Sequence, residues 1–118
     1  MSDTPTLYHN PRCSKSRATL QLLREQGVEP RVVEYLKTPP DAATLQQIVG
    51  MLGIRPRDLL RTGEAQYREL GLKDADLDDA ELIRTMVEHP RLIERPILVA
   101  GGQARIGRPP EQVLEILS

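Results

Sequence analysis

Residues 6–35 decide the fold, and they read TLYHNPRCSKSRATLQLLREQGVEPRVVEY. Thr6–Tyr8 is expected to form a short strand. A helix is expected over Ser14–Gln26, because apolar residues recur there at helical spacing and Gly27 follows as a stop. The β-branched stretch Arg31–Tyr35 predicts a second strand. The order β-α-β implies a right-handed crossover between two parallel strands.

The remaining sequence changes character twice. Residues 38–92 carry helical patterns throughout, beginning with Thr38 as a candidate cap for a helix that ends near Leu52. Residues 97–100 and 103–106 then flank two glycines and predict a hairpin, after which a closing helix is expected. The chain is therefore predicted to be one α/β domain, 1–118, with an all-helical insertion at about 38–92.

Composition limits the classes of function. The 118 residues include 16 basic and 17 acidic side chains, which argues against a general affinity for nucleic acid. The apolar runs are too short to span a membrane, and Met1–Pro5 shows no signal-peptide pattern. A single cysteine cannot form an internal disulfide, so a reducing cytoplasm is the expected location.

That cysteine, Cys13, lies where the first strand meets the first helix, with Arg12, Lys15 and Arg17 around it. A free cysteine is more often a small buried apolar residue. Here, however, the cations and the helix N-terminus would lower the thiol pKa from roughly 8.5 to about 3.5–7.5. The same features attract an oxyanion. We therefore interpret Cys13 as a nucleophile beside an anion site.

Several common thiol and phosphate motifs are absent. No second cysteine lies three residues after Cys13, so a thioredoxin-type dithiol is excluded. Arg17 comes four residues after Cys13 rather than six, which excludes a phosphatase-type loop. There is no P-loop or G-x-G-x-x-G, and two scattered histidines with one cysteine make no zinc site.

Three arginines occupy positions where a solvated charge is less expected. Arg61 follows two leucines, Arg95 precedes Pro96 and an apolar strand, and Arg108 lies between a glycine and a proline. A guanidinium suits a tetrahedral oxyanion because it donates two parallel hydrogen bonds. Spacing alone leaves each of the three open to a surface interpretation. It also leaves open whether the Arg95–Pro96 bond is cis.

His9 and the serines near Cys13 have two interpretations each. His9 could be a half-exposed, idle residue at a strand end, or its positive charge could help to hold the thiolate. Ser14 and Ser16 could simply begin the helix, or a hydroxyl could donate to the sulfur.

Taken together, five collinear motifs between Leu7 and Leu117 resemble the glutaredoxin-dependent arsenate reductases, and most closely the short arsenate-reductase-like members. The motifs are Tyr8-His9-Asn10-Pro11-x-Cys13, Thr38-Pro39-Pro40, Leu59-Leu60-Arg61, Glu94-Arg95-Pro96-Ile97 and Ile106-Gly107-Arg108-Pro109.

This resemblance implies a thioredoxin-like fold, a mixed sheet of about four strands flanked by helices, with a helical insertion. It implies that Cys13 attacks arsenate and that a cis-proline stands at Pro96. It assigns oxyanion binding to Arg61, Arg95 and Arg108. It assigns support of the thiolate to His9, Ser16 and Arg17. Because the chain lacks a second thiol, glutathione is the implied co-substrate and glutaredoxin the implied partner, with no bound cofactor or metal.

Two alternatives remain open. The same fold family includes Spx-type regulators, which contact RNA polymerase rather than a small anion. A thiol oxidoreductase of this fold could also act on another substrate, such as a glutathione mixed disulfide. The joint presence of Arg61, Arg95 and Arg108 favours the oxyanion enzyme.

Overall fold

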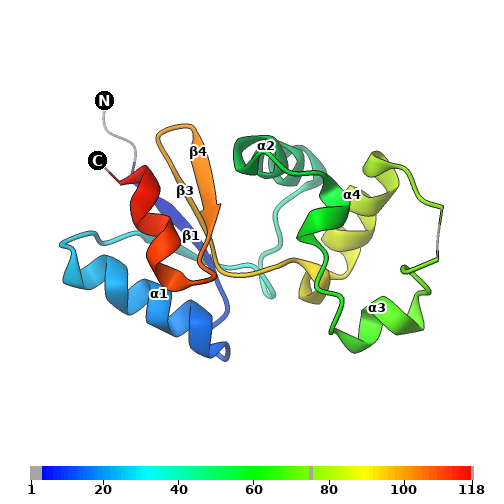
Figure 1. Ribbon diagram of the computed structural model, residues 1–118, viewed down its shortest axis with the longest axis horizontal. Coiled ribbons are helices and arrows are strands. Elements are labelled where there is room, and N and C mark those ends of the chain that lie inside the picture. Colours follow the sequence, from blue (N-terminus) through cyan, green and yellow to red (C-terminus); the bar gives the residue numbers. More distant parts are fainter. Residues whose placement is uncertain (1–3, 75, 118) are drawn as a thin grey trace. The chain divides into compact units, whose positions relative to one another are not determined.

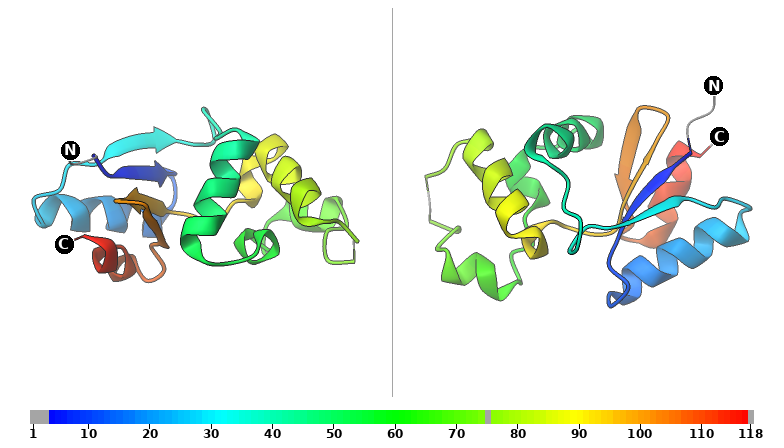
Figure 2. Two further views of the ribbon diagram at one scale, coloured as in Figure 1. Left: turned by 90° about the horizontal axis from the view of Figure 1, so that it is seen from above. Right: turned by 180° about the vertical axis from the view of Figure 1, so that it is seen from behind.

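The structure is a computed structural model that describes residues 4–74 and 76–117 (Figures 1 and 2). Two compact units are present. The first, the αβ unit, combines Met1–Thr38 with Arg95–Ser118, and the second, the helical unit, is Pro39–Glu94. We describe each unit by itself.

A four-stranded mixed sheet forms the αβ unit, in the order β2-β1-β3-β4. β1 pairs with β2 in parallel and with β3 in antiparallel orientation, and β3 and β4 form a hairpin. The predicted β-α-β unit and hairpin are thereby confirmed. The strands are β1 (Thr6–His9), β2 (Arg31–Glu34), β3 (Ile97–Ala100) and β4 (Gln103–Ile106).

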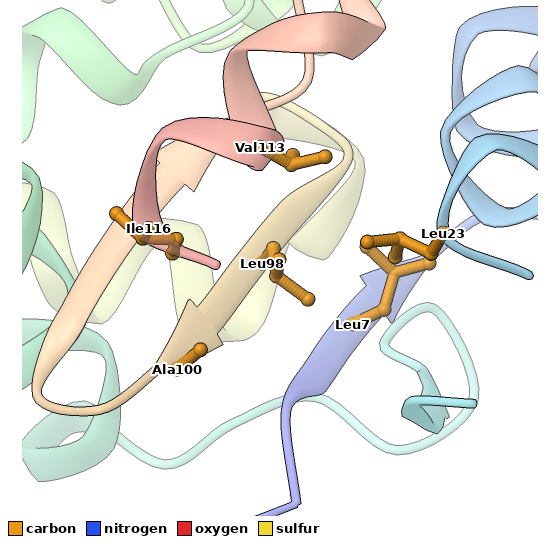
Figure 3. Close-up of a cluster of buried hydrophobic side chains, with 6 residues drawn as sticks. All are labelled: Leu7, Leu23, Leu98, Ala100, Val113 and Ile116. Carbon is orange, nitrogen blue, oxygen red and sulfur yellow. The ribbon is translucent and has the colours of Figure 1, made fainter. Parts of the chain in front are cut away.

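Two helices cover one face of this sheet, namely α1 (Ser14–Glu25) and the 3₁₀ helix η3 (Pro110–Ile116). Figure 3 shows the core between them and the strands, which is aliphatic because the chain has no Phe or Trp. α1 ends as predicted, since Gly27 adopts a φ of +79° that only glycine accepts freely. The core residues are Leu7, Leu23, Leu98, Ala100, Val113 and Ile116.

The helical unit contains no named strand among its described residues, as the sequence predicted for 38–92. Asp41, rather than Thr38, caps α2: its Oδ1 accepts from the N–H of Thr44 at 2.8 Å. Two prolines follow Thr38 and keep the chain out of the α region until residue 42. The helices are α2 (Ala42–Leu52), η1 (Pro56–Leu59), α3 (Ala65–Glu69), α4 (Asp79–Glu88) and η2 (Pro90–Leu92).

The sheet topology brings three chain segments together at one end of the strands of the αβ unit. β1 ends there and continues into the Cys13 loop. Because β3 is antiparallel to β1, it begins at that end, with Ile97 opposite Tyr8. β4 ends there too, since Ile106 lies opposite Ile97. Arg95 and Arg108, which flank the hairpin, therefore come to the end of β1.

The Arg95–Pro96 bond is cis, as the resemblance implied, and Arg108–Pro109 is a second cis bond that the sequence analysis did not predict. None of the described helices has the length and apolar character needed to cross a membrane.

Candidate active site

Cys13 is the residue immediately before α1, with an extended backbone and a half-buried, free thiol. Its N–H donates to the carbonyl of Asn10 at 3.0 Å, and its own carbonyl accepts from Arg17 N–H at 3.0 Å. These bonds fix a tight turn between β1 and α1. The sulfur makes no capping hydrogen bond of standard geometry, although first-turn N–H groups act on it.

Opposing effects set the pKa of the Cys13 thiol. Partial burial is the largest single effect and raises that pKa. The backbone N–H of Ser16, the guanidinium of Arg95 and the backbone N–H of Lys15 lower it, and together they outweigh burial. The pKa of Cys13 therefore lies below its ordinary value, and the reactive thiolate is favoured.

Two of the three predicted arginines lie against this sulfur. Nη2 of Arg108 is 3.7 Å from Sγ of Cys13, and Arg95 also donates a hydrogen bond to the thiol. Nε of Arg108 donates to the backbone carbonyl of Arg95 at 2.8 Å. That bond orients the guanidinium of Arg108 beside the sulfur.

His9 lies in a buried hydrogen-bond chain that begins at the Cys13 turn. Its Nδ1 is 2.7 Å from Oγ of Ser16, which accepts from the N–H of Asn10 at 3.0 Å. Burial is the main cause that lowers the pKa of His9, ahead of the opposing effect of Glu34. The neutral imidazole is therefore favoured, and Ser16 Oγ–H can donate to it.

The half-exposed interpretation of His9 is wrong, and its support of the thiolate by a positive charge stays a prediction that its environment disfavours. At 5% exposure the side chain is neither half exposed nor idle, and its lowered pKa disfavours the positive charge. The Ser16 hydroxyl is likewise engaged with His9 and the N–H of Asn10, whereas the Ser16 backbone N–H serves the thiolate. Both residues thus hold the shape of the turn that carries Cys13.

Arg17 holds the same turn from outside. Its Nη1 donates to the carbonyl of Pro11 at 2.9 Å, while the N–H of Arg12 donates to Oδ1 of Asn10 at 3.0 Å.

Within residues 4–74 and 76–117, no group of three or more His, Cys, Asp or Glu side chains is arranged to hold a metal ion.

Arg61 belongs to the helical unit and has two acidic neighbours there. Its Nη1 donates to Oε1 of Glu94, and its Nε lies 3.9 Å from Oε2 of Glu64. The backbone fixes this position as well, because Arg61 N–H donates to the carbonyl of Leu92 at 2.8 Å. Two carboxylates thus balance its charge within this unit, and its binding of an oxyanion stays a prediction.

Comparison with known proteins decides the family. The sequence model of the ArsC family matches residues 8–116, which include every segment around Cys13 described above. This chain belongs to the ArsC family. The share matched is nearly the whole chain.

Several relatives of this ArsC chain are similar over almost their full length. It is 58% identical to the uncharacterized Escherichia coli protein YfgD over 118 residues, 99% of each chain. It is 47% identical to an arsenate reductase of Neisseria meningitidis, over 94% of this chain and 96% of that one. A solved arsenate reductase from Vibrio cholerae superposes with a TM-score of 0.93 at 54% identity, covering 96% and 97% of the two chains. The predicted thioredoxin-like fold is thereby confirmed.

Gly107 is a site residue of this ArsC chain that the sequence analysis did not single out. A Cβ at this position would lie 2.5 Å from Oγ1 of Thr19 and 2.9 Å from Cγ of Pro96. The Gly107 N–H also donates to the carbonyl of Pro96 at 2.8 Å. This close approach seats Arg108 beside α1. The sequence signal for this close approach was a glycine directly between the end of a predicted strand and Arg108.

Gly107→Ala is therefore expected to destabilise the ArsC fold by about 1–3 kcal/mol, because Thr19 is fully buried and the added methyl overpacks the contact. Chemical denaturation measures the free energy of unfolding. Gly50→Ala is the matched control, since that helical glycine has open space around its Cβ position and the change should be neutral or stabilising. A cost at Gly107 no larger than at Gly50 would contradict the close approach.

The lowered pKa of Cys13 predicts a titration shift. The thiolate absorbance should rise at lower pH in the folded protein than in the same chain unfolded in urea. Because the folded pKa is the lower one, this group stabilises the fold above the unfolded pKa, and that contribution is lost as pH falls through the folded pKa. A folded titration at or above the unfolded one would refute the electrostatic argument.

Proposed function

We propose that this protein reduces arsenate to arsenite, with the Cys13 thiolate as nucleophile. The observation that carries the proposal is the contact of Arg95 and Arg108 with the sulfur, which joins a favoured thiolate to two cations. An anion bound by these guanidinium groups would lie within reach of the nucleophile. Arsenate is the substrate class because arsenate reductases are among the relatives of similar length.

The first step joins sulfur to arsenic. Arg95 and Arg108 bind the oxyanion, and Arg61 is the proposed third cation. The thiolate of Cys13 attacks arsenic, an S–As bond forms and one As–O bond breaks. The departing group is an arsenic-bound hydroxyl, which takes one proton from solvent and leaves as water. The guanidinium groups stabilise the negative charge as it develops on the remaining oxygens.

Reduction needs a second thiol, and the chain has only one cysteine. We assign this part to glutathione. Its thiolate attacks Sγ of Cys13, an S–S bond forms and the S–As bond breaks. The electron pair of that bond stays on arsenic, which passes from the pentavalent to the trivalent state and leaves as arsenite. Glutaredoxin then reduces the mixed disulfide and restores Cys13, in the reducing cytoplasm.

A groove beside α1 is the site that we propose for a peptide thiol, next to the Cys13 turn, although Cys13 itself does not line it. Its volume is about 620 Å³, and its walls include Pro11 and Arg17 from the turn and first helix around Cys13. Arg24 lines it as well, but its guanidinium is ion-paired with Glu29 at 3.2 Å, so Arg17 is the guanidinium that we assign to a carboxylate of a small peptide.

A coupled assay tests this function. The protein is mixed with arsenate, glutathione, glutaredoxin and glutathione reductase, and consumption of NADPH is followed beside direct measurement of arsenite. One arsenite for each NADPH, and no turnover when arsenate, glutathione or glutaredoxin is omitted, is the expected result. Turnover with a glutathionylated peptide but not with arsenate would instead identify a thiol oxidoreductase. Activity with thioredoxin but not glutaredoxin would reject the proposed reductant.

A further inference from the structure

Tyr35 is a buried residue that the mechanism above does not use. It lies at the end of the sheet where the strands meet the Cys13 turn. Its side chain is 1% exposed, although it carries a polar hydroxyl. It directly follows β2, whose last residue, Glu34, is in register with His9 of the parallel strand β1. Tyr35 therefore lies just past the end of β1, level with the start of the turn that carries Cys13.

Arg95 approaches the same point from the other side of β1. It lies two residues before Ile97, which is opposite Tyr8 across the antiparallel pair. β2 and β3 flank β1, so Tyr35 and Arg95 come from the two strands on either side of it. The guanidinium of Arg95 interacts with the phenol of Tyr35 and with the thiol of Cys13.

We propose that Tyr35 is a positioning residue, which holds the Arg95 guanidinium against the sulfur of Cys13. This inference rests on the proposed function for its effect on turnover. The guanidinium of Arg95 interacts with the phenol of Tyr35 on one side and with the sulfur of Cys13 on the other. The long, flexible side chain of Arg95 is thereby held on two sides before substrate binds.

The chemistry of the anchor matters as much as its position. Glu64 and Glu94 hold Arg61 with negative charge, which cancels part of its attraction for an anion. The neutral phenol of Tyr35 fixes Arg95 without such cancellation. Arg95 therefore keeps its full charge for the thiolate and the oxyanion.

Tyr35→Phe removes the hydroxyl and keeps the ring. In the folded, substrate-free protein, the pKa of Cys13 should rise. With arsenate, kcat/KM should fall about tenfold, the usual scale for one hydrogen bond to a charged group. Tyr67→Phe is the matched control, because Tyr67 is not among the groups that act on Arg95 or Cys13. An unchanged thiol pKa in a folded Tyr35→Phe protein would overturn the proposal, whatever the arsenate activity.

A double-mutant cycle shows whether Tyr35 acts through Arg95. Once Arg95→Ala is present, Tyr35→Phe should cause no further rise in the thiol pKa, because the group it positions is gone. An equal rise in both backgrounds would overturn the proposal. The thiol titration needs no arsenate, so it can succeed even if the coupled assay shows that arsenate is not the substrate.

One further measurement needs no variant of Tyr35. In the NMR spectrum of the wild-type protein, an Arg95 guanidinium held between Tyr35 and Cys13 should rotate slowly and give separate signals for its NH₂ groups. Averaged signals for Arg95, like those of exposed Arg12, would overturn the proposal even if Tyr35→Phe fails to fold.

Discussion

Replacing Cys13 with serine is expected to reduce arsenate turnover at least about a thousandfold, to the background of the coupled assay, because loss of a nucleophile removes the covalent route. The fold should be retained. Serine is a favoured residue immediately before a helix, and the thiol it replaces makes no standard capping bond. At a pH below the folded pKa of Cys13, where the thiolate adds no stability, the free energy of unfolding should therefore stay the same or rise slightly, as measured by chemical denaturation.

The single cysteine gives this prediction a clean control. Incubation with oxidised glutathione should add one glutathione to the wild-type chain, detected by mass spectrometry, and none to Cys13→Ser. A serine variant that keeps wild-type arsenate turnover would reject Cys13 as the nucleophile. A variant that binds arsenate but forms no arsenite is the result that the mechanism requires.

Arg108→Ala is expected to lower kcat for arsenate by about 10²–10³-fold, the usual cost of removing one fixed donor to developing negative charge. The guanidinium lies 3.7 Å from the sulfur and is held by the carbonyl of Arg95. The thiol pKa should be less affected than kcat, because Ser16, Lys15 and Arg95 are the groups that lower it. Steady-state kinetics and the thiol titration together separate the two effects.

Arg105→Ala is the matched control for this prediction. Arg105 lies on the same hairpin, three residues earlier, but its Nε donates to Glu115 at 2.9 Å. Its removal should change kcat less than twofold, since exposed ion pairs contribute little. Arg108→Lys should fall between the wild type and Arg108→Ala, because it keeps the charge but loses the Nε contact with Arg95. Equal losses in Arg105→Ala and Arg108→Ala would contradict a specific role for Arg108.

Most of the fold followed from local patterns in the sequence. The β-α-β start and the hairpin were predictable because periodicity and glycine turns are local signals. The first helix of the insertion was given the wrong cap, since Thr38 and Asp41 are both good capping residues and only the intervening prolines decide between them.

The site was harder to predict, because its contacts join residues far apart in the chain. Spacing could nominate Arg95 and Arg108, but only the antiparallel register of β3 brings them to Cys13. Nothing local indicated that His9 would be buried against Ser16, or that Gly107 would approach Thr19. Long-range packing sets such contacts, and a single sequence does not display it.

Arg95 and Arg108 lie just before and just after the hairpin of β3 and β4, so the hairpin sets the distance between them. Pairing of Ile97 with Ile106 fixes how far apart the two arginines emerge, whereas the Gly101–Gly102 tip lies at the opposite end. Residues added at the tip would lengthen the loop without altering that ladder. A one-residue slip within the ladder would turn every side chain of one strand to the other face and part the two charges. The separation of the two charges therefore depends on the paired residues near the sulfur and not on the length of the loop at the tip.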